Sequence, residues 1–83
     1  MIIIDISGFP AEYPVYKVEG TKSNIISYTT PEMVEELIPR LCFNHGIENV
    51  RIVGLASYAE KLAAAIRTNY NFNYNQNLNV EVF

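Results

Sequence analysis

The sequence has little that would support export, membrane insertion or an internal disulfide. Cys42 is the only cysteine among 83 residues, and tryptophan is absent. A basic start followed by a long apolar run and a small-residue cleavage site, the signature of an export signal, is not found. No stretch approaches the roughly 20 apolar residues that a membrane-spanning helix needs. We therefore expect a protein of the reducing, cytoplasmic compartment, with no membrane partner.

Clustered positive charge is also missing. Six lysines and arginines are scattered through the chain against nine acids, and the net charge is -3. Binding to nucleic acid draws most of its affinity from grouped lysine and arginine side chains that neutralise phosphates. The charge balance therefore argues against a dedicated DNA-binding or RNA-binding protein.

What is present is the composition of one small globular domain. Hydrophobic residues make up 49% of the chain and charged residues 18%, which leaves room for a single domain over residues 1–83. A domain of this size buries a small fraction of its surface, so a partner subunit would add to its stability. We therefore expect oligomerisation, in the form of a homodimer.

Three strands are predicted before the first helix. Isoleucines at positions 2, 3, 4 and 6, interrupted by Asp5, are typical of a strand that is buried on both faces or nearly so. Residues 15–19 alternate as a second strand that ends at Gly20. A turn over residues 21–24 then leads into a third strand at residues 25–29. Because the connections are short, the three strands are expected to form an antiparallel meander.

A first helix is predicted from Thr30-Pro31-Glu32. These residues supply a hydroxyl that can cap, a proline whose missing N–H costs nothing at that position, and an acid near the positive end of the helix dipole. Gly46 is expected to end the helix in a left-handed conformation, with Ile47 folding back onto it. The apolar stripe at spacings of three and four consists of Met33, Val34, Leu37, Ile38, Leu41 and Cys42.

A fourth strand and a second helix follow in close succession. Residues 50–53 form the strand, and a tight turn leads to Ser57, which with Glu60 has the spacing of a capping box. The helix that begins there is expected to run to about Thr68. Its buried stripe consists of Ala59, Leu62, Ala63 and Ile66.

In the final segment, asparagine occupies every second position from Asn69 to Asn79. Strict alternation is the period of a strand with one dry face, but asparagine is a poor strand former. We interpret residues 69–77 as a loop or edge ribbon whose aromatic side chains pack down while the asparagines face water. Residues 79–83 are predicted to form the last strand.

The predicted order is strand, strand, strand, helix, strand, helix, strand. It defines an α/β domain with a mixed sheet (βββαβαβ), in which an antiparallel three-stranded meander is followed by two right-handed βαβ crossovers. This order resembles the core of the ribonuclease H-like fold, which actin-like ATPases and many nucleases share. The resemblance covers nearly the whole chain and rests on element order alone.

The resemblance implies a metal-binding aspartate on the first strand, where this chain has Asp5. It also implies a second acid near the end of the fourth strand, where the chain instead has residues 54–57, Gly-Leu-Ala-Ser. Two-metal phosphoryl chemistry needs several carboxylates around the ions, so the missing acid argues against nuclease activity. We interpret Asp5 as a carboxylate that accepts hydrogen bonds from the turn at residues 7–8.

Two further groups of polar residues have the chemistry of a ligand site. Asp5, Thr30 and Ser57 are expected at one edge of the sheet, where a helix N-terminus following a strand can hold an anion. Cys42 and His45 have a spacing at which both could face one metal, but no other cysteine or histidine completes the ligand set. We therefore predict no metal and no cofactor, with Cys42 in the core and His45 at the end of its helix.

Aromatic side chains are the most informative feature. Six tyrosines and four phenylalanines are more than a core this small is expected to hide. Tyrosines beside asparagine have the composition of an interaction surface, because they offer large rigid contacts with polar tips. The alternative is that the rings cover the ends of a small sheet. The predicted interaction surface consists of Tyr13, Tyr16, Tyr70, Phe72 and Tyr74.

These features favour a non-enzymatic module for protein–protein interaction or self-association, whose partner is another protein or a second copy. The alternative hypothesis is a domain that responds to a small molecule or nucleotide, or a catalytically degenerate ribonuclease H-like nuclease, through Asp5, Thr30 and Ser57. The composition, rich in isoleucine and asparagine, is typical of AT-rich coding in phages and mobile elements of low-GC bacteria.

Overall fold

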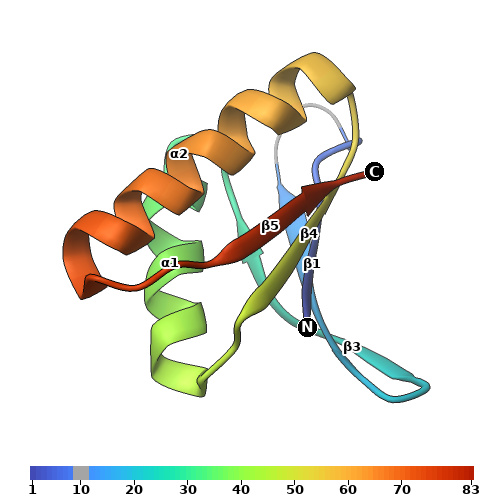
Figure 1. Ribbon diagram of the computed structural model, residues 1–83. Helices are drawn as coiled ribbons and strands as arrows, with labels where there is room; N and C mark the ends of the chain where they lie inside the picture. The colour runs from blue at the N-terminus through green and yellow to red at the C-terminus, as the bar shows by residue number, and fades with distance from the viewer. Residues whose placement is uncertain (9–11) are drawn as a thin grey trace.

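The computed structural model describes residues 1–8 and 12–83 (Figure 1). Its strands and helices follow the predicted order along the chain. The elements are β1 (Ile2–Asp5), β2 (Tyr13–Glu19), β3 (Lys22–Thr29), α1 (Val34–His45), β4 (Asn49–Val53), α2 (Ala56–Tyr74) and β5 (Asn79–Val82).

The five strands form one mixed sheet in the order β3-β2-β1-β4-β5, with β1 in the middle. β1 pairs antiparallel with β2, and β2 pairs antiparallel with β3, which is the predicted meander. β4 runs parallel to β1, and β5 runs parallel to β4. The predicted fold class is therefore confirmed, because the chain is an α/β domain with a meander followed by two βαβ crossovers.

Both helices lie on the same face of the sheet (Figure 1). The strands that each helix connects are parallel, and both connections step across the sheet in the same direction, from β3 to β4 and from β4 to β5. Right-handed crossovers that step in one direction place their helices on one face. Over the described ranges, the opposite face is not covered by a helix or by a second sheet.

The core lies between the sheet and the two helices. On β1, Ile2 and Ile4 are fully buried, whereas Ile3 between them is only half-buried. The prediction was a strand buried on both faces or nearly so; β1 is fully buried on one face and only half-buried on the other, where Ile3 and Asp5 lie. The helices contribute residues that include Val34, Ile38, Cys42, Leu62, Ala63 and Ile66.

Helix α1 begins later than predicted. Thr30 does not cap it through its hydroxyl. Instead, its backbone carbonyl accepts hydrogen bonds from the N–H groups of Met33 (3.1 Å) and Val34 (3.0 Å), so a turn precedes the helix. The end of α1 is as predicted. Gly46 has a φ of 65°, its N–H donates to Phe43, and the N–H of Ile47 donates to the carbonyl of Cys42 at 2.9 Å.

Helix α2 differs from the prediction at both ends. It begins at Ala56 after Leu55, and no side-chain hydrogen bond caps it, so the predicted capping box of Ser57 and Glu60 does not form. The helix continues to Tyr74, and the prediction of a loop or edge ribbon from residue 69 is wrong for the six residues up to Tyr74. Asn75 ends the helix with a left-handed φ of 53°.

The hairpin between β2 and β3 is tighter than predicted. Glu19 pairs with Lys22, so the connection is Gly20-Thr21 rather than a turn over residues 21–24. The register shifts once, because Val15 pairs with Ser27 and the next residue, Tyr16, pairs with Ile25. β3 therefore carries one extra residue, a β-bulge that twists the edge of the sheet.

Candidate functional site

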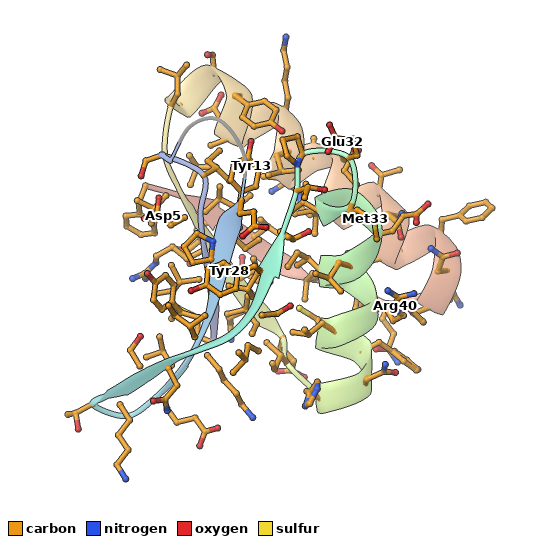
Figure 2. The ribbon with its side chains drawn as sticks, turned by 180° about the vertical axis from the view of Figure 1, so that it is seen from behind. Asp5, Tyr13, Tyr28, Glu32, Met33 and Arg40 are labelled. Atoms are coloured by element: carbon orange, nitrogen blue, oxygen red, sulfur yellow. The ribbon has the colours of Figure 1, made fainter. Side chains whose placement is uncertain are left out.

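The face of the sheet that the helices leave uncovered, here called the open face, is defined by strand register. Ile3 and Asp5 lie on it, because the neighbouring residues of β1 are buried against the helices. Figure 2 shows Asp5 and Tyr28 on the side of the sheet away from Arg40 of α1 and from Met33, which directly precedes that helix. Residues that pair across strands share a face, so, beside a largely polar row that contains the pairs Ser23–Val18 and Asn49–Asn79, the open face holds two further rows. In the order β3 to β5 they are Ile25, Tyr16, Ile3, Arg51, Glu81 and then Tyr28, Pro14, Asp5, Val53, Phe83.

The open face is largely apolar although it faces water. Ile25, Tyr28 and Phe83 are 46%, 56% and 59% exposed, and Ile3 and Val53 between them are half-buried. Single exposed apolar side chains are common on proteins, but contiguous apolar patches mark interaction sites. The open face holds such a patch, since its apolar residues are neighbours in register on β3, β2, β1 and β4, and Phe83 directly follows β5.

Arg51 stands near the centre of the patch. Its guanidinium carbon lies 4.0 Å from the centroid of the Phe83 ring, in the geometry of a cation–π contact. Its Nε has no hydrogen-bond partner among the residues that the structure describes. Glu81 pairs with Arg51 in register, yet the ion pair found in the described ranges is Lys17–Glu19, at 3.0 Å. Arg51 and Glu81 thus retain charge that the chain does not neutralise by a direct pair.

Asp5 stabilises the turn that follows β1, as predicted from the sequence. Its Oδ1 accepts hydrogen bonds from the backbone N–H of Ser7 at 2.9 Å and from the Ser7 hydroxyl. This two-residue reach is the ordinary geometry of an aspartate that stabilises a turn. The carboxylate therefore holds the chain as it leaves β1.

The predicted aromatic surface is wrong in two of its five residues. Tyr13 and Tyr70 are only 6% and 5% exposed, because their rings are part of the core. Tyr16 is half-buried on the open face, and Tyr74 is half-buried against the core. Phe72 is 86% exposed, as expected, but it lies on the helix layer. The five side chains therefore do not form one surface.

Helical geometry explains where the aromatic rings go. Tyr70 and Tyr74 follow Ile66 at spacings of four, so α2 carries all three on its buried stripe. The Tyr74 ring stacks on Phe43 of α1 with centroids 4.1 Å apart, and Tyr70 packs beside Tyr74 at 5.2 Å. Phe72, two positions from each tyrosine, points to the other side of the helix.

The predicted ligand edge is not assembled into a site. Asp5, Thr30 and Ser57 follow or end parallel strands, so they share one edge of the sheet. The Asp5 carboxylate accepts a hydrogen bond from the N–H of Ser7. The carbonyl of Thr30 accepts hydrogen bonds in the turn before α1, and Ser57 lies in the first turn of α2. In the described part of the chain, no hydrogen bond joins any two of these three residues.

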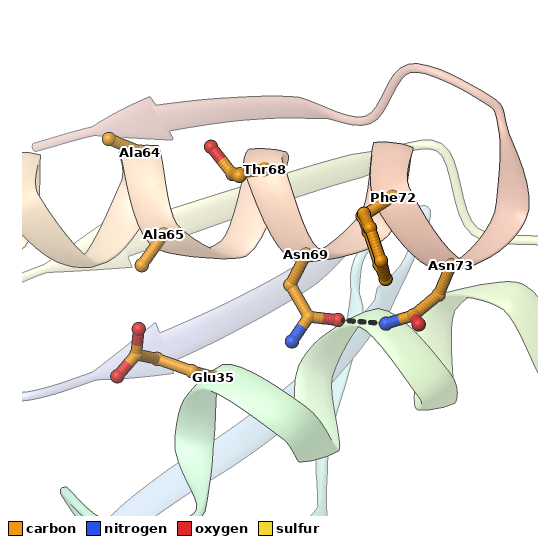
Figure 3. Close-up of a pocket in the computed structure, with 7 residues that line it drawn as sticks. All are labelled: Glu35, Ala64, Ala65, Thr68, Asn69, Phe72 and Asn73. Atoms are coloured by element: carbon orange, nitrogen blue, oxygen red, sulfur yellow. Dashed lines mark hydrogen bonds between the residues drawn. The ribbon is translucent and has the colours of Figure 1, made fainter.

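A shallow groove of about 480 Å³ runs between the outer sides of α1 and α2 (Figure 3). Glu35 stands on one wall, and Asn69 and Asn73 form the other, joined by an amide hydrogen bond of 2.6 Å. Phe72 stands at its end. Small side chains such as Ala65 form the floor, so the groove presents few groups that could orient a ligand.

Residues 1–8 and 12–83 contain no group of three or more histidine, cysteine, aspartate or glutamate side chains placed to hold a metal. Cys42 is fully buried, as predicted, and this burial raises the pKa of its thiol to about 12. A thiol with that pKa is almost wholly protonated at neutral pH and is a poor nucleophile. No helix in the same ranges has the length and apolar character to cross a membrane.

Both edges of the sheet are protected against further strand pairing. On β5, the N–H groups of Asn79 and Phe83 bond toward β4, so the carbonyl of Val80 faces outward. Arg67 of α2 donates from Nη1 to that carbonyl at 3.0 Å. On β3, the bulge and Lys22 have the features by which proteins blunt an edge. Over residues 1–8 and 12–83, the open face has no comparable protection.

Comparisons of the chain with protein-family models, with curated proteins and with solved structures found no match.

The prediction from sequence did not include Tyr28, Phe83, Arg51 or Val53 among the site residues. A signal was present, because apolar side chains occupy consecutive positions at residues 2–4 and again at Ile25 and Ile26. Such runs indicate that both faces of a strand are apolar. They do not indicate which face the helices cover, and that depends on the hand and direction of the crossovers.

Proposed function

We propose that this chain is a protein-interaction module without enzymatic activity, and that its open face is the binding surface. The observation that carries the proposal is a contiguous group of apolar side chains on the face of the sheet that the helices leave uncovered. A sheet face that lies in water ordinarily carries polar side chains, whereas this one exposes Ile25, Tyr28 and Phe83. A partner would supply the missing layer.

The chemistry of the open face supports a protein partner. Tyrosine, phenylalanine and arginine are the residue types that concentrate binding energy at interfaces, and the face carries Tyr28, Phe83 and Arg51. Arg51 lies on an aromatic ring, so it loses little side-chain freedom on binding. Its charge is available to a carboxylate or a carbonyl of the partner.

Site-specific photo-crosslinking of the full chain in cells tests the proposal. A photoreactive phenylalanine analogue replaces Tyr28 in one variant and Phe72 in the other. The two positions are matched, because both hold exposed aromatic rings but only Tyr28 lies on the open face. We expect covalent adducts to protein from position 28, to a second copy or to another chain, and none above background from position 72.

Adducts that are absent at position 28, or equally abundant at both positions, would refute the open face as the binding surface. Thermal unfolding of both variants should match that of the unmodified chain, since each replacement conserves an exposed ring.

A further inference from the structure

We infer that the open face is covered by the open face of a second copy of this chain, in a two-fold symmetric sandwich of two sheets. This inference rests on the proposed function and names its partner. It is carried by the size of the face, by the protection of the sheet edges and by the residues that a two-fold axis would bring together.

The size of the open face matches a second sheet better than a single helix. Five strands about 4.8 Å apart span about 24 Å, whereas a helix with its side chains is about 10 to 12 Å wide. One helix would therefore leave about half of the face in water. The molecule measures 32 × 29 × 19 Å, so the face occupies one of its broad sides. A standard interface buries about 800 Å² on each partner, which requires the whole of such a face.

The alternative way for two sheets to associate is side by side, through strand pairing at an edge. Arg67 occupies the outward carbonyl of Val80 on β5, and the bulge in β3 distorts the other edge. Edge-to-edge pairing is thus disfavoured. Association through the face uses the surface that the chain leaves unprotected.

A two-fold axis along β1 overlays all five strands of one copy on five strands of the other, because β1 is the middle strand. β5 then lies over β3 of the second copy, and β4 lies over its β2. In register, Phe83 faces Tyr28 of the second copy, Arg51 faces its Tyr16, and Ile3 faces its Ile3. These are an aromatic pair, a cation–π pair and an aliphatic pair, and the first two occur twice in the dimer.

The charges on the face are compatible with this arrangement. Arg51 and Glu81 of one copy lie over tyrosine and isoleucine, so no like charges meet there. Asp5 is the one acid placed near its own counterpart, and its Oδ1 is already turned to Ser7.

Sedimentation velocity of the full chain over a concentration series is the first experiment. We expect a reversible species of twice the monomer mass. Tyr28→Lys and Phe83→Glu should each weaken the dimer by about thirtyfold or more, because the Phe83–Tyr28 pair occurs twice in the dimer and either substitution disrupts both copies. Phe72→Lys, at a more exposed ring outside the open face, should leave the dissociation constant of the dimer unchanged. Tyr28 and Phe83 are themselves exposed, so both variants should keep the circular dichroism of the unmodified chain.

Mixing the two weakened variants, Tyr28→Lys and Phe83→Glu, tests the axis itself. In the mixed dimer, the lysine introduced at position 28 of one chain faces the glutamate introduced at position 83 of the other, and they attract. The symmetry-related contact keeps the original Phe83–Tyr28 pair. We expect the mixed dimer to bind at least about tenfold more tightly than the dimer of either single variant. No recovery, with each single variant weakened, would overturn the axis along β1.

A chain that is monomeric at every concentration would overturn the self-association inference. In that case, adducts from position 28 to a different protein would still support the interaction module. The absence of such adducts would refute both the interaction module and the self-association inference. A dimer that Phe72→Lys disrupts and Tyr28→Lys does not would place the contact on the helices and overturn the inference as well.

Discussion

Phe43 and Tyr74 stack with ring centroids 4.1 Å apart and planes within 8° of parallel, and so join the end of α1 to the end of α2. The contact explains why a segment rich in asparagine is helical. Asparagine is a weak helix former, but packing of an apolar stripe outweighs intrinsic propensity. The stripe of α2 continues through Tyr70 and Tyr74 into this stack.

The stack predicts unequal effects of two neighbouring aromatic substitutions. Tyr74→Ala should lower the free energy of unfolding by about 1.5–3 kcal/mol, because a half-buried ring and its aromatic contact are lost. Phe72→Ala, at a ring that is 86% exposed, should change it by less than about 0.5 kcal/mol. Urea unfolding followed by circular dichroism measures both. Equal losses would contradict a helix through residues 69–74.

Gly54 predicts a steric effect at the end of β4. A Cβ on Gly54 would overlap Cγ1 of Ile6, a buried residue that directly follows the neighbouring strand β1. Gly54→Ala should therefore destabilise the domain by about 1–3 kcal/mol. Gly8→Ala is the matched control, because a Cβ there meets open space, and its effect should stay below about 0.5 kcal/mol. The midpoint of thermal unfolding reports both, and a neutral Gly54→Ala would contradict the close approach.

Cys42 predicts a loss of stability at alkaline pH. Burial raises the pKa of the folded thiol from 9.0 to about 12, so above pH 9 the unfolded chain releases a proton that the folded chain keeps. The contribution is complete below pH 9 and falls as pH rises from 9 to about 12. Burial also raises the pKa of Tyr58 and Tyr70, which act in the same direction. Urea unfolding of Cys42→Ala should show a shallower fall with pH than the unmodified chain. Parallel curves would assign the alkaline loss to other groups.

Arg67 predicts protection of the β5 edge. Arg67→Ala removes the hydrogen bond to the Val80 carbonyl and should lower the free energy of unfolding by about 1–2 kcal/mol. It should also increase light scattering at high protein concentration, because the edge can then pair with another strand. Arg40→Ala, which removes an exposed arginine of α1, serves as the control for loss of charge. If both variants scatter alike, charge rather than edge protection controls solubility.

The alternative function predicts a response to nucleotide that the proposed function does not. Because Asp5, Thr30 and Ser57 are not joined into a site, we expect Mg²⁺ with or without ATP to leave the unfolding midpoint unchanged. A rise in midpoint that Asp5→Asn abolishes would instead support a ligand-responsive domain. Asp5→Asn keeps an acceptor for Ser7, so its own effect on stability should be small.

Local patterns were sufficient for much of the fold. The left-handed Gly46 after α1, the turn that Asp5 caps, and the apolar stripes of both helices depend on residues within a few positions of one another. Element order then limits the topology, because short connections favour a meander and parallel crossovers have one hand. These constraints predicted the antiparallel meander and the two parallel crossovers without any long-range information.

The errors occurred where a distant partner decides between local alternatives. Ser57 could have capped α2, but the helix begins at Ala56, before it. Alternation of asparagine and aromatic residues predicts a ribbon, yet the four-residue spacing of Tyr70 and Tyr74 fits a helix equally well, and Phe43 is the partner that favours the helix. The candidate site failed for the same reason, since Tyr13 and Tyr70 are apolar enough to be buried and tyrosine composition cannot show which rings the core accepts.

By itself, the sequence determined the number of strands and helices and the order in which they join, because periodicity and turn chemistry are properties of neighbouring residues. The tertiary structure alone decided that both helices cover one face of the sheet and that Ile3, Tyr28, Val53 and Phe83 lie on the other. Exposure of a side chain depends on what packs over it. In this chain the packing is set by two crossovers that turn the same way.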